Sequence, residues 1–183
     1  MRTSRTRGLL AATMLAMAAV AAACVPPGTP PSTTTTTAPQ HVVVHVSPGA
    51  TPAPVTVEPG ETVTVVGSGF TTTANLGTRP PLAGKPAGVY VTFGRFADTW
   101  KPSQGAPSSA RQILEQMWAL PSASFDALGG IEGLVEMGLG GTFSVELTAA
   151  HADGTNPNYG IAIYPGSGSS NPIEELFVPV TLG

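Results

Sequence analysis

The 183-residue sequence predicts an all-β fold, an antiparallel β-sandwich with one helical insertion. Three observations support this prediction. About seven short runs rich in Val, Ile and Thr alternate apolar and polar side chains, as strands with one buried face do. Clusters of Pro, Gly, Asn and Ser separate these runs. One segment alone has convincing helical spacing in the part of the chain that follows the N-terminal leader.

Residues 1–23 have the pattern of a lipoprotein signal peptide. Three arginines precede an apolar run at 9–23, and its 15 residues are fewer than the ~20 that span a bilayer. The run ends in three alanines followed by Cys24, the only cysteine, and this resembles the lipobox of bacterial lipoproteins. The resemblance implies that Cys24 is lipidated and that the protein is extracytoplasmic, anchored to the outer face of the cell membrane. The alternative is ordinary secretory cleavage near the alanines.

Residues 24–40 comprise the lipidated cysteine and a linker rich in Pro and Thr. Segment 25–40 has no apolar periodicity and contains four prolines before its Thr run. We expect a disordered, extended stalk, whose 16 residues at ~3.1 Å each reach on the order of 50 Å. The Thr run is also a candidate for O-glycosylation.

The charge of the remaining chain excludes one class of partner. Removal of residues 1–23 leaves five Lys and Arg against 11 Asp and Glu, a net charge of about −6. Nucleic-acid-binding proteins need a basic patch, and none is present, so no nucleic acid is expected as a partner. The folded domain is assigned to residues 41–183, which are numerous enough to form a stable core without a disulfide.

The first half of the domain is predicted to consist of strands. Val89, Val91 and Phe93 alternate with polar or small residues, so the run 88–94 is predicted to be a central strand. The polar residues 71–87, rich in Pro and Gly, are predicted to cross from one sheet to the other. Earlier strands are predicted at 41–46, 55–58 and 61–67, with the turn Pro59-Gly60 between the last two.

The insertion spans about 95–140 and is predicted to contain the helix. Ser109 and Gln112 have capping-box spacing, and Pro121 ends the pattern. A shorter helical turn is expected at 122–128, followed by a Gly-rich stretch that is irregular or weakly β. The residues expected on one face of the longer helix are Ala110, Ile113, Leu114 and Met117.

The C-terminal third returns to β patterning. A strand at 143–148 is predicted to form a hairpin with a strand at 159–164. Tyr159 lies two residues before Ile161, the tyrosine-corner spacing of immunoglobulin-like strands, so the sandwich is expected to be immunoglobulin-like. In a last strand at 176–182, Pro179 indicates an edge position or a missing backbone donor.

Several segments resemble known exported proteins. The two runs VTVEPGETVTVVGSGF at 55–70 and GVYVTF at 88–93 resemble opening strands of neocarzinostatin-like, immunoglobulin-like domains of high-GC Gram-positive bacteria. Further segments are similar to surface proteins that often accompany HtaA-type haem-uptake domains: 100–103, 106–111, 118–121 and 158–166. The resemblance implies an immunoglobulin-like fold on a cell surface and implies no established activity.

The sequence offers no catalytic or metal site. His41 and His45 lie on one side of a predicted strand, but no third ligand accompanies them, so a solvated strand face is favoured over a metal pair. The oxygens of the loop 151–158 lack the spacing of an EF-hand, which favours an ordinary loop over a calcium site. The serines have neither the G-x-S-x-G pattern nor an adjacent base. We therefore expect no enzyme activity and no cofactor.

Aromatic and cationic side chains concentrate around the insertion, in a chain that is poor in both. Trp and Arg are enriched where surfaces bind partners. The alternative is that both tryptophans seal the insertion onto the sandwich. The candidate binding residues are Tyr90, Arg95, Trp100, Lys101, Arg111 and Trp118.

Two functions are compatible with these residues. The leading expectation is a non-catalytic, membrane-anchored cell-surface lipoprotein that acts as an interaction module for an envelope protein or a wall polymer. The alternative is an accessory protein that binds haem or another small hydrophobic ligand. In that case Tyr90, Tyr159 or Tyr164 would hold the haem iron as tyrosinate.

Overall fold

The computed structural model describes residues 41–183, which form nine strands in two sheets. Within these residues the predicted all-β sandwich is confirmed. The predictions for the signal peptide, Cys24 and the stalk concern residues 1–40, which lie outside the described residues. Between residues 41 and 183, no helix has the length and apolar character needed to cross a membrane.

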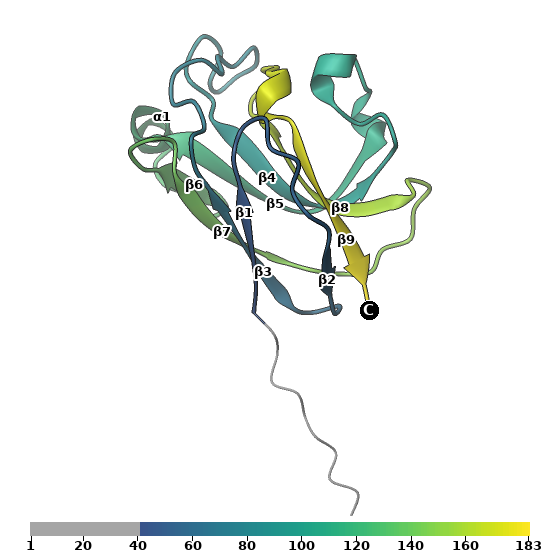
Figure 1. Ribbon diagram of the computed structural model, residues 1–183. Helices are drawn as coiled ribbons and strands as arrows, with labels where there is room; N and C mark the ends of the chain where they lie inside the picture. Colours follow the sequence, from purple (N-terminus) through teal and green to yellow (C-terminus); the bar gives the residue numbers. More distant parts are fainter. Residues whose placement is uncertain (1–40) are drawn as a thin grey trace, which may run out of the picture. The chain divides into compact units, whose positions relative to one another are not determined.

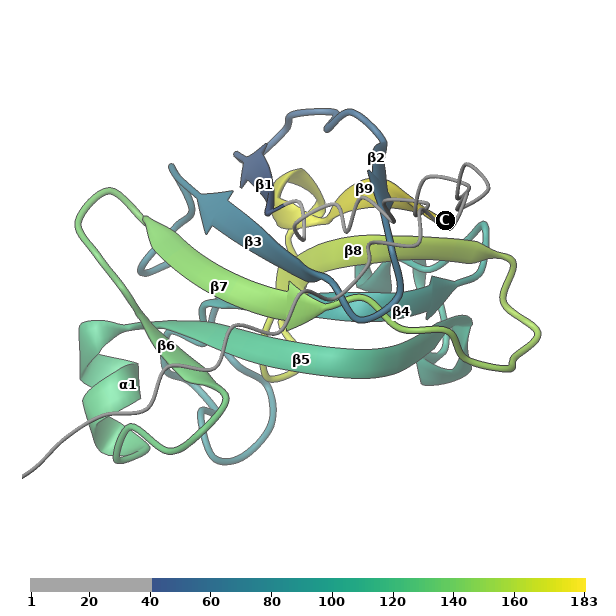
Figure 2. The same ribbon diagram turned by 90° about the horizontal axis from the view of Figure 1, so that it is seen from below.

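The two sheets pack against each other, as Figure 1 and Figure 2 show. The smaller sheet has the order β1-β3-β7, with β1 at Val42–Val46, β3 at Thr62–Gly67 and β7 at Phe143–Thr148. The larger sheet has the order β2-β9-β8-β4-β5-β6. Its strands are β2 at Val55–Val57, β9 at Leu176–Leu182, β8 at Asn158–Pro165, β4 at Val89–Phe96, β5 at Arg111–Pro121 and β6 at Leu134–Met137.

The core lies between the sheets and follows the predicted alternation. In β7 the residues Phe143, Val145 and Leu147 are buried and the residues between them are exposed. In β4 the side chains of Val89, Val91 and Phe93 are fully buried in the same core. The intervening residue Thr92 is buried as well, and its hydroxyl donates to the carbonyl oxygen of Ala162 at 3.0 Å. β4 is therefore the interior strand that its sequence predicts.

The prediction of a purely antiparallel sandwich is wrong. The pairs β1-β3, β2-β9 and β5-β6 are parallel, whereas β3-β7, β4-β5, β4-β8 and β8-β9 are antiparallel. Parallel neighbours need a crossover connection. The chain provides such crossovers. Between β1 and β3 in the sequence it passes through β2, which belongs to the other sheet, and between β5 and β6 it forms the helix α1 (Ser122–Ala127).

The predicted helix around Ser109–Met117 is wrong, because most of this segment forms β5. Strand β5 contains a bulge: Phe93 of β4 pairs with Glu115 and Gly94 pairs with Ile113, which leaves Leu114 unpaired. A bulge shifts the alternation of side chains by one residue. The resulting apolar spacing resembles that of a helix.

The helical content of the insertion is small. The shorter predicted helix at 122–128 is confirmed as α1, and the weakly β stretch after it contains β6. Three 3₁₀ turns complete the helical elements of the described residues: η1 (Pro102–Gln104), η2 (Ser108–Ala110) and η3 (Pro172–Glu174).

The predicted hairpin of β7 and β8 is wrong, because these strands belong to different sheets. Their connection crosses between the sheets and is closed by Tyr159. The Tyr159 hydroxyl donates to the carbonyl oxygen of Ala152 and accepts from its N–H, both at 2.9 Å. This is the kind of backbone contact that a tyrosine corner makes.

The proposed edge position of Pro179 is also wrong. Strand β9 lies between β8 and β2, so it is an interior strand. Pro179 stands where β9 exchanges partners, opposite Gly160 of β8 and one residue before Val180, which pairs with Val55 of β2. The second alternative, a position without a backbone donor, agrees with this geometry.

Candidate binding cavity

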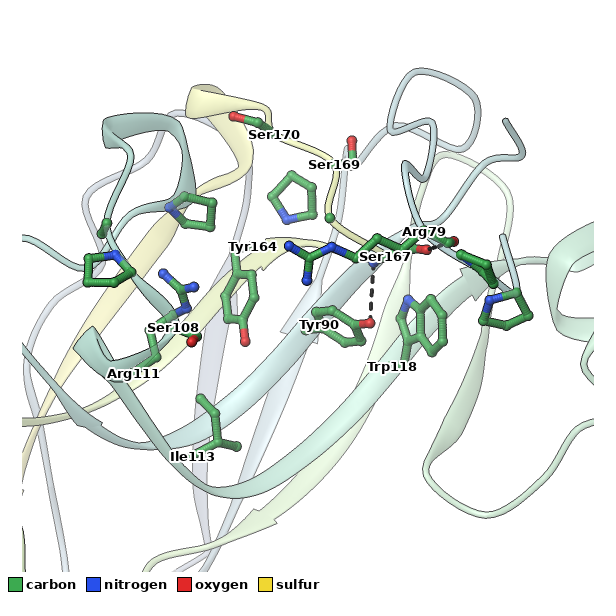
Figure 3. Close-up of a pocket in the computed structure, with 17 residues that line it drawn as sticks. Arg79, Tyr90, Ser108, Arg111, Ile113, Trp118, Tyr164, Ser167, Ser169 and Ser170 are labelled. Atoms are coloured by element: carbon green, nitrogen blue, oxygen red, sulfur yellow. Dashed lines mark hydrogen bonds between the residues drawn. The ribbon is translucent and has the colours of Figure 1, made fainter. Parts of the chain in front are cut away.

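A cavity of about 660 Å³ lies over the outer face of the larger sheet, opposite the inter-sheet core (Figure 3). This volume is within the range of about 300–1,000 Å³ that is typical of small-molecule sites. Loops from three separate parts of the chain form its walls. Its lining consists of Arg79, Pro80, Pro81, Tyr90, Pro102, Ala106, Pro107, Ser108, Arg111, Ile113, Trp118, Tyr164, Pro165, Ser167, Gly168, Ser169 and Ser170.

The floor of the cavity is a row of three aromatic rings on adjacent strands. Tyr90 of β4 pairs in register with Trp118 of β5 on one side and with Tyr164 of β8 on the other. The ring centroid of Tyr90 lies 4.9 Å from that of Trp118 and 5.6 Å from that of Tyr164. Strand register therefore fixes the row, because side chains opposite each other on paired strands are neighbours.

Two hydrogen bonds hold this floor in place. The indole N–H of Trp118 donates to the carbonyl oxygen of Ala87 at 2.7 Å, and the Tyr90 hydroxyl accepts from the N–H of Ser167 at 3.2 Å. Gly166 makes the first bond possible, since a Cβ at this position would overlap both the Ala87 oxygen and the Trp118 indole. The faces of the two rings are thus positioned before any ligand arrives.

The cavity has a positive lining. Arg79 and Arg111 are its charged residues, and no Asp or Glu lines it. Arg111 donates to the carbonyl oxygen of Trp100, and its guanidinium lies 5.5 Å from the ring centroid of Tyr164. The backbone of Arg79 is held by Ser167, whose hydroxyl donates to the Arg79 carbonyl oxygen at 2.6 Å. The exposed Arg79 side chain points from this loop into the cavity (Figure 3).

Tyr164 stays neutral at physiological pH. Burial raises the pKa of Tyr164 to about 12, the charge of Arg111 opposes this rise, and the neighbouring Tyr90 adds to it. The loss of hydration on burial disfavours the charged phenolate. Tyr164 therefore contributes a neutral ring and hydroxyl to the cavity.

Two adjacent buried carboxylates tie down the loops beside the cavity. Glu174 accepts from the N–H of Thr71 and from the amide of Asn75, both at 2.6 Å. Glu175 accepts from the N–H of Ser103 at 2.9 Å and from its hydroxyl at 2.5 Å. The turn η3 and Glu175, which follows it, thereby hold both the segment that leads to Arg79 and the turn η1. Within residues 41–183 no buried side-chain polar atom lacks a hydrogen-bond partner.

The structure brings together three of the six predicted binding residues: Tyr90, Arg111 and Trp118 line the cavity. Trp100 is 5% exposed and packs beneath it, with ring centroids 5.6 Å from Phe96 and 6.2 Å from Tyr164.

Two predicted residues lie elsewhere. Arg95 holds the loop before β8, where it donates to the carbonyl oxygens of Asn156 at 2.7 Å and Ala152 at 2.9 Å. Lys101 precedes Pro102 of the wall but is not itself part of the lining.

Sequence reasoning missed Arg79 and the serines of the 167–170 loop. Arg79 follows a Gly-Thr pair and precedes two prolines, and the serines lie in a Gly- and Ser-rich turn, so both segments have the composition of ordinary connections. For Arg79 the sequence did contain one signal, the scarcity of cations, because Arg79 is one of five Lys and Arg in residues 41–183.

The histidines predicted to lie on a solvated face do so. Residues His41 and His45 are exposed on the side of β1 opposite Val44 and Val46, and His41 is 2.9 Å from the Thr64 hydroxyl. Among the described residues no group of three His, Cys, Asp or Glu side chains is placed to hold a metal ion.

Comparison of the chain with protein-family models, with curated proteins and with solved structures found no match. The function is therefore argued from the cavity and its position in the fold.

Proposed function

We propose that this chain is a non-catalytic, membrane-anchored cell-surface lipoprotein. Its immunoglobulin-like sandwich acts as a binding module, and the cavity over the outer sheet face is its contact site for an envelope protein or wall polymer. The observation that carries this proposal is the combination of an aromatic floor with two arginines and no acidic side chain. Trp, Tyr and Arg are the residues enriched where protein surfaces bind partners.

The chemistry of the lining supports binding rather than catalysis. The lining contains four serines but no His, Asp, Glu, Cys or Lys. A serine nucleophile needs a general base within hydrogen-bond reach. The cavity therefore has groups that recognise a ligand and none that activates a nucleophile.

The position of the cavity supports a tethered module. Strand β1 begins at Val42 beside Val63 of β3, and β3 ends at Gly67, after which the chain enters the loops that reach Arg79. In Figure 1 the described chain begins and ends at the bottom of the domain, and these loops lie at the top. A tether that enters at His41 leaves the cavity end of the domain free to meet a partner.

The immunoglobulin-like assignment has support from Tyr159. Its hydroxyl bonds to the backbone of Ala152, seven residues upstream, as in a tyrosine corner. The short strands and the crossing between two sheets agree with the same architecture.

The haem alternative has weaker support. No His, Met or Cys lines the cavity, so its tyrosines are the lining residues able to bind iron. Burial raises the pKa of Tyr164 to about 12, which opposes the tyrosinate form. The Tyr159 hydroxyl is already bonded twice to Ala152. These contacts favour the interaction module.

Attachment and binding are tested separately with the full chain. We expect the parent protein to partition into detergent with the membrane fraction, and the Cys24→Ser variant to be released. Recovery of both forms in the aqueous phase would contradict the lipid anchor.

For binding, the Cys24→Ser chain is sedimented with envelope fragments of the organism that produces it. We expect Trp118→Ala to lower the bound fraction at least several-fold, because it removes the largest ring of the cavity floor. Lys85→Gln is the control, since Lys85 is exposed and outside the lining. Equal binding by Trp118→Ala and the parent would exclude the cavity as the contact site.

A further inference from the structure

We propose that the cavity binds an anionic saccharide. Its carboxylate or phosphate lies between Arg79 and Arg111, and one sugar ring lies on Trp118 and Tyr90. This inference rests on the proposed function and deepens it, because it names the chemical class of the envelope ligand.

The two arginines reach the cavity from separate segments. Arg79 lies in the loop before β4, whereas Arg111 is the first residue of β5. Both guanidinium groups lie on the side of the cavity that holds Tyr164, as Figure 3 shows. A guanidinium binds carboxylate and phosphate oxygens through two parallel N–H groups, so a convergent pair is suited to one anionic group.

This positive site runs against the charge of the domain. Residues 41–183 carry five Lys and Arg against 11 Asp and Glu, yet two of the five cations line the cavity and none of the acids does. A neutral or cationic ligand would leave both guanidinium charges without an anionic partner, although Arg111 already donates to the carbonyl oxygen of Trp100. An anionic group gives them one.

The rest of the lining has two kinds of surface that match a sugar ring. Trp118 and Tyr90 are half-buried and present fixed aromatic faces, on which the C–H face of a pyranose packs. Ser108 and Ser170 are exposed residues of the lining, and a hydroxyl is able to bond the polar edge of the same ring. A wholly apolar ligand would satisfy the rings but not the hydroxyls.

The two parts of the site lie side by side. Tyr90 is the middle ring of the floor, with Trp118 on one side and Tyr164, beneath Arg111, on the other. A ligand that lies along this row meets the aromatic platform at one end and the cationic pair at the other. This geometry selects a saccharide whose negative group is attached directly to the stacked ring or to its neighbour.

The test is a titration of the full chain, released from the membrane by Cys24→Ser. The probes are galacturonic acid oligomers, mannose 6-phosphate, their neutral counterparts galactose oligomers and mannose, and inorganic phosphate. Calorimetry gives the affinity. Fluorescence of the same chain with Trp100→Phe, in which Trp118 is the one remaining tryptophan, reports occupancy of the floor. We expect one anionic saccharide to bind at least tenfold more tightly than its neutral counterpart and than inorganic phosphate. Which one does so distinguishes a carboxylate ligand from a phosphate ligand.

Variants assign the binding to named groups. Arg79→Gln is expected to weaken the preferred saccharide about tenfold or more, since it removes a charge-assisted pair of hydrogen bonds. Arg79 is exposed, so this variant is expected to fold normally. Arg111→Gln tests the second arginine in the same way and is expected to weaken the same saccharide. Lys85→Gln is the control, because it removes one positive charge outside the cavity. Trp118→Phe is expected to weaken saccharides and leave inorganic phosphate unaffected.

Several results would overturn the inference. Equal affinity for anionic and neutral saccharides would show that the two arginines do not select a negatively charged ligand. Equal loss of affinity in Arg79→Gln and Lys85→Gln would place the binding outside the cavity. If no saccharide binds while the chain still sediments with envelope fragments through Trp118, the ligand class is wrong and the proposed function stands.

Discussion

The two tryptophans are predicted to have opposite roles, and one pair of substitutions separates them. Trp100 is 5% exposed and lies among Phe96, Tyr164 and Phe177, with its ring centroid 5.9 Å from that of Phe177. Truncation of such a residue removes its contacts and leaves a cavity. We expect Trp100→Ala to lower the free energy of unfolding by about 3–5 kcal/mol.

Trp118 is half-buried, and its truncation costs less. Its hydrogen bond to the Ala87 carbonyl oxygen contributes about 1 kcal/mol. Its ring pair with Tyr90 at 4.9 Å contributes about 0.5–1.5 kcal/mol. We therefore expect Trp118→Ala to cost about 2 kcal/mol and to leave a folded domain. Because Trp118 is one of the three rings of the floor of the proposed binding cavity, the same variant is expected to lose the proposed envelope binding.

The assay is equilibrium urea unfolding of the full Cys24→Ser chain, followed by far-UV circular dichroism, with envelope sedimentation on the same preparations. A domain stability of about 5–15 kcal/mol leaves Trp100→Ala measurable in most of that range. Trp100→Phe keeps most of the ring packing and serves if the alanine variant does not fold. If Trp118→Ala destabilises the chain as much as Trp100→Ala, Trp118 is part of the framework. The reasoning that assigns it to a contact surface is then refuted.

Three further predictions concern the groups around the floor. Glu175→Gln keeps the side-chain volume but weakens the hydrogen bonds to Ser103. We therefore expect the free energy of unfolding to fall by about 1–2 kcal/mol and the Ser103 amide hydrogen to exchange faster with solvent. Unchanged exchange would show that other contacts hold η1. Tyr164 is expected to ionise near pH 12 in an absorbance titration compared with that of a Tyr164→Phe variant. Because an unfolded tyrosine ionises near pH 10, the contribution of Tyr164 to stability is constant below about pH 10 and is lost between pH 10 and 12. A Tyr164 step near pH 10 in the difference between the two titrations would contradict its burial. Gly166→Ala forces a Cβ against the Trp118 indole. We expect it to lower the free energy of unfolding by about 1–3 kcal/mol and to shift the tryptophan emission. Stability and emission equal to those of the parent would show that this contact is loose.

The strands that are regular in the structure are those that the sequence predicts. β7 alternates buried and exposed residues without interruption, and β4 pairs with β8 without a register shift and keeps Val89, Val91 and Phe93 in the core. β5 fails because Leu114 is an extra residue in the strand. Ile113 and Trp118, five residues apart, both line the cavity, which a regular strand with a period of two does not allow. The single bulge thus changes a strand pattern into an apparent helical one.

The connections of the fold are less predictable than its strands. A hairpin and a crossover have the same turn residues, and the loop at 151–158 satisfies either description. The choice is made by long-range contacts such as those of Arg95, which donates to Ala152 and Asn156 from β4. The sequence of the loop alone does not predict these contacts with residues of a distant strand.

The candidate site divides in the same way. Tyr90, Arg111 and Trp118 were predicted because aromatic and cationic residues concentrate around the insertion of a chain that is poor in both. Arg79 and the serines were not, because they reach the cavity through a loop fold that depends on Ser167 and on buried Glu174. Composition identifies candidate binding residues, whereas tertiary contacts decide which of them line the same cavity.

The proposed binding cavity combines side chains on strands with side chains on loops. Strand register positions the aromatic floor, so substitutions there act on the fold as well as on binding. Arg79 and Ser170 stand on exposed loop positions, where side chains vary at little cost in stability. Because two buried carboxylates fix the paths of the neighbouring loops, a change of side chain at Arg79 alters the charge of the cavity without moving its walls. A variant with Arg79→Glu is therefore expected to keep the stability of the parent and to reverse the preference of the cavity from anionic to neutral or cationic probes.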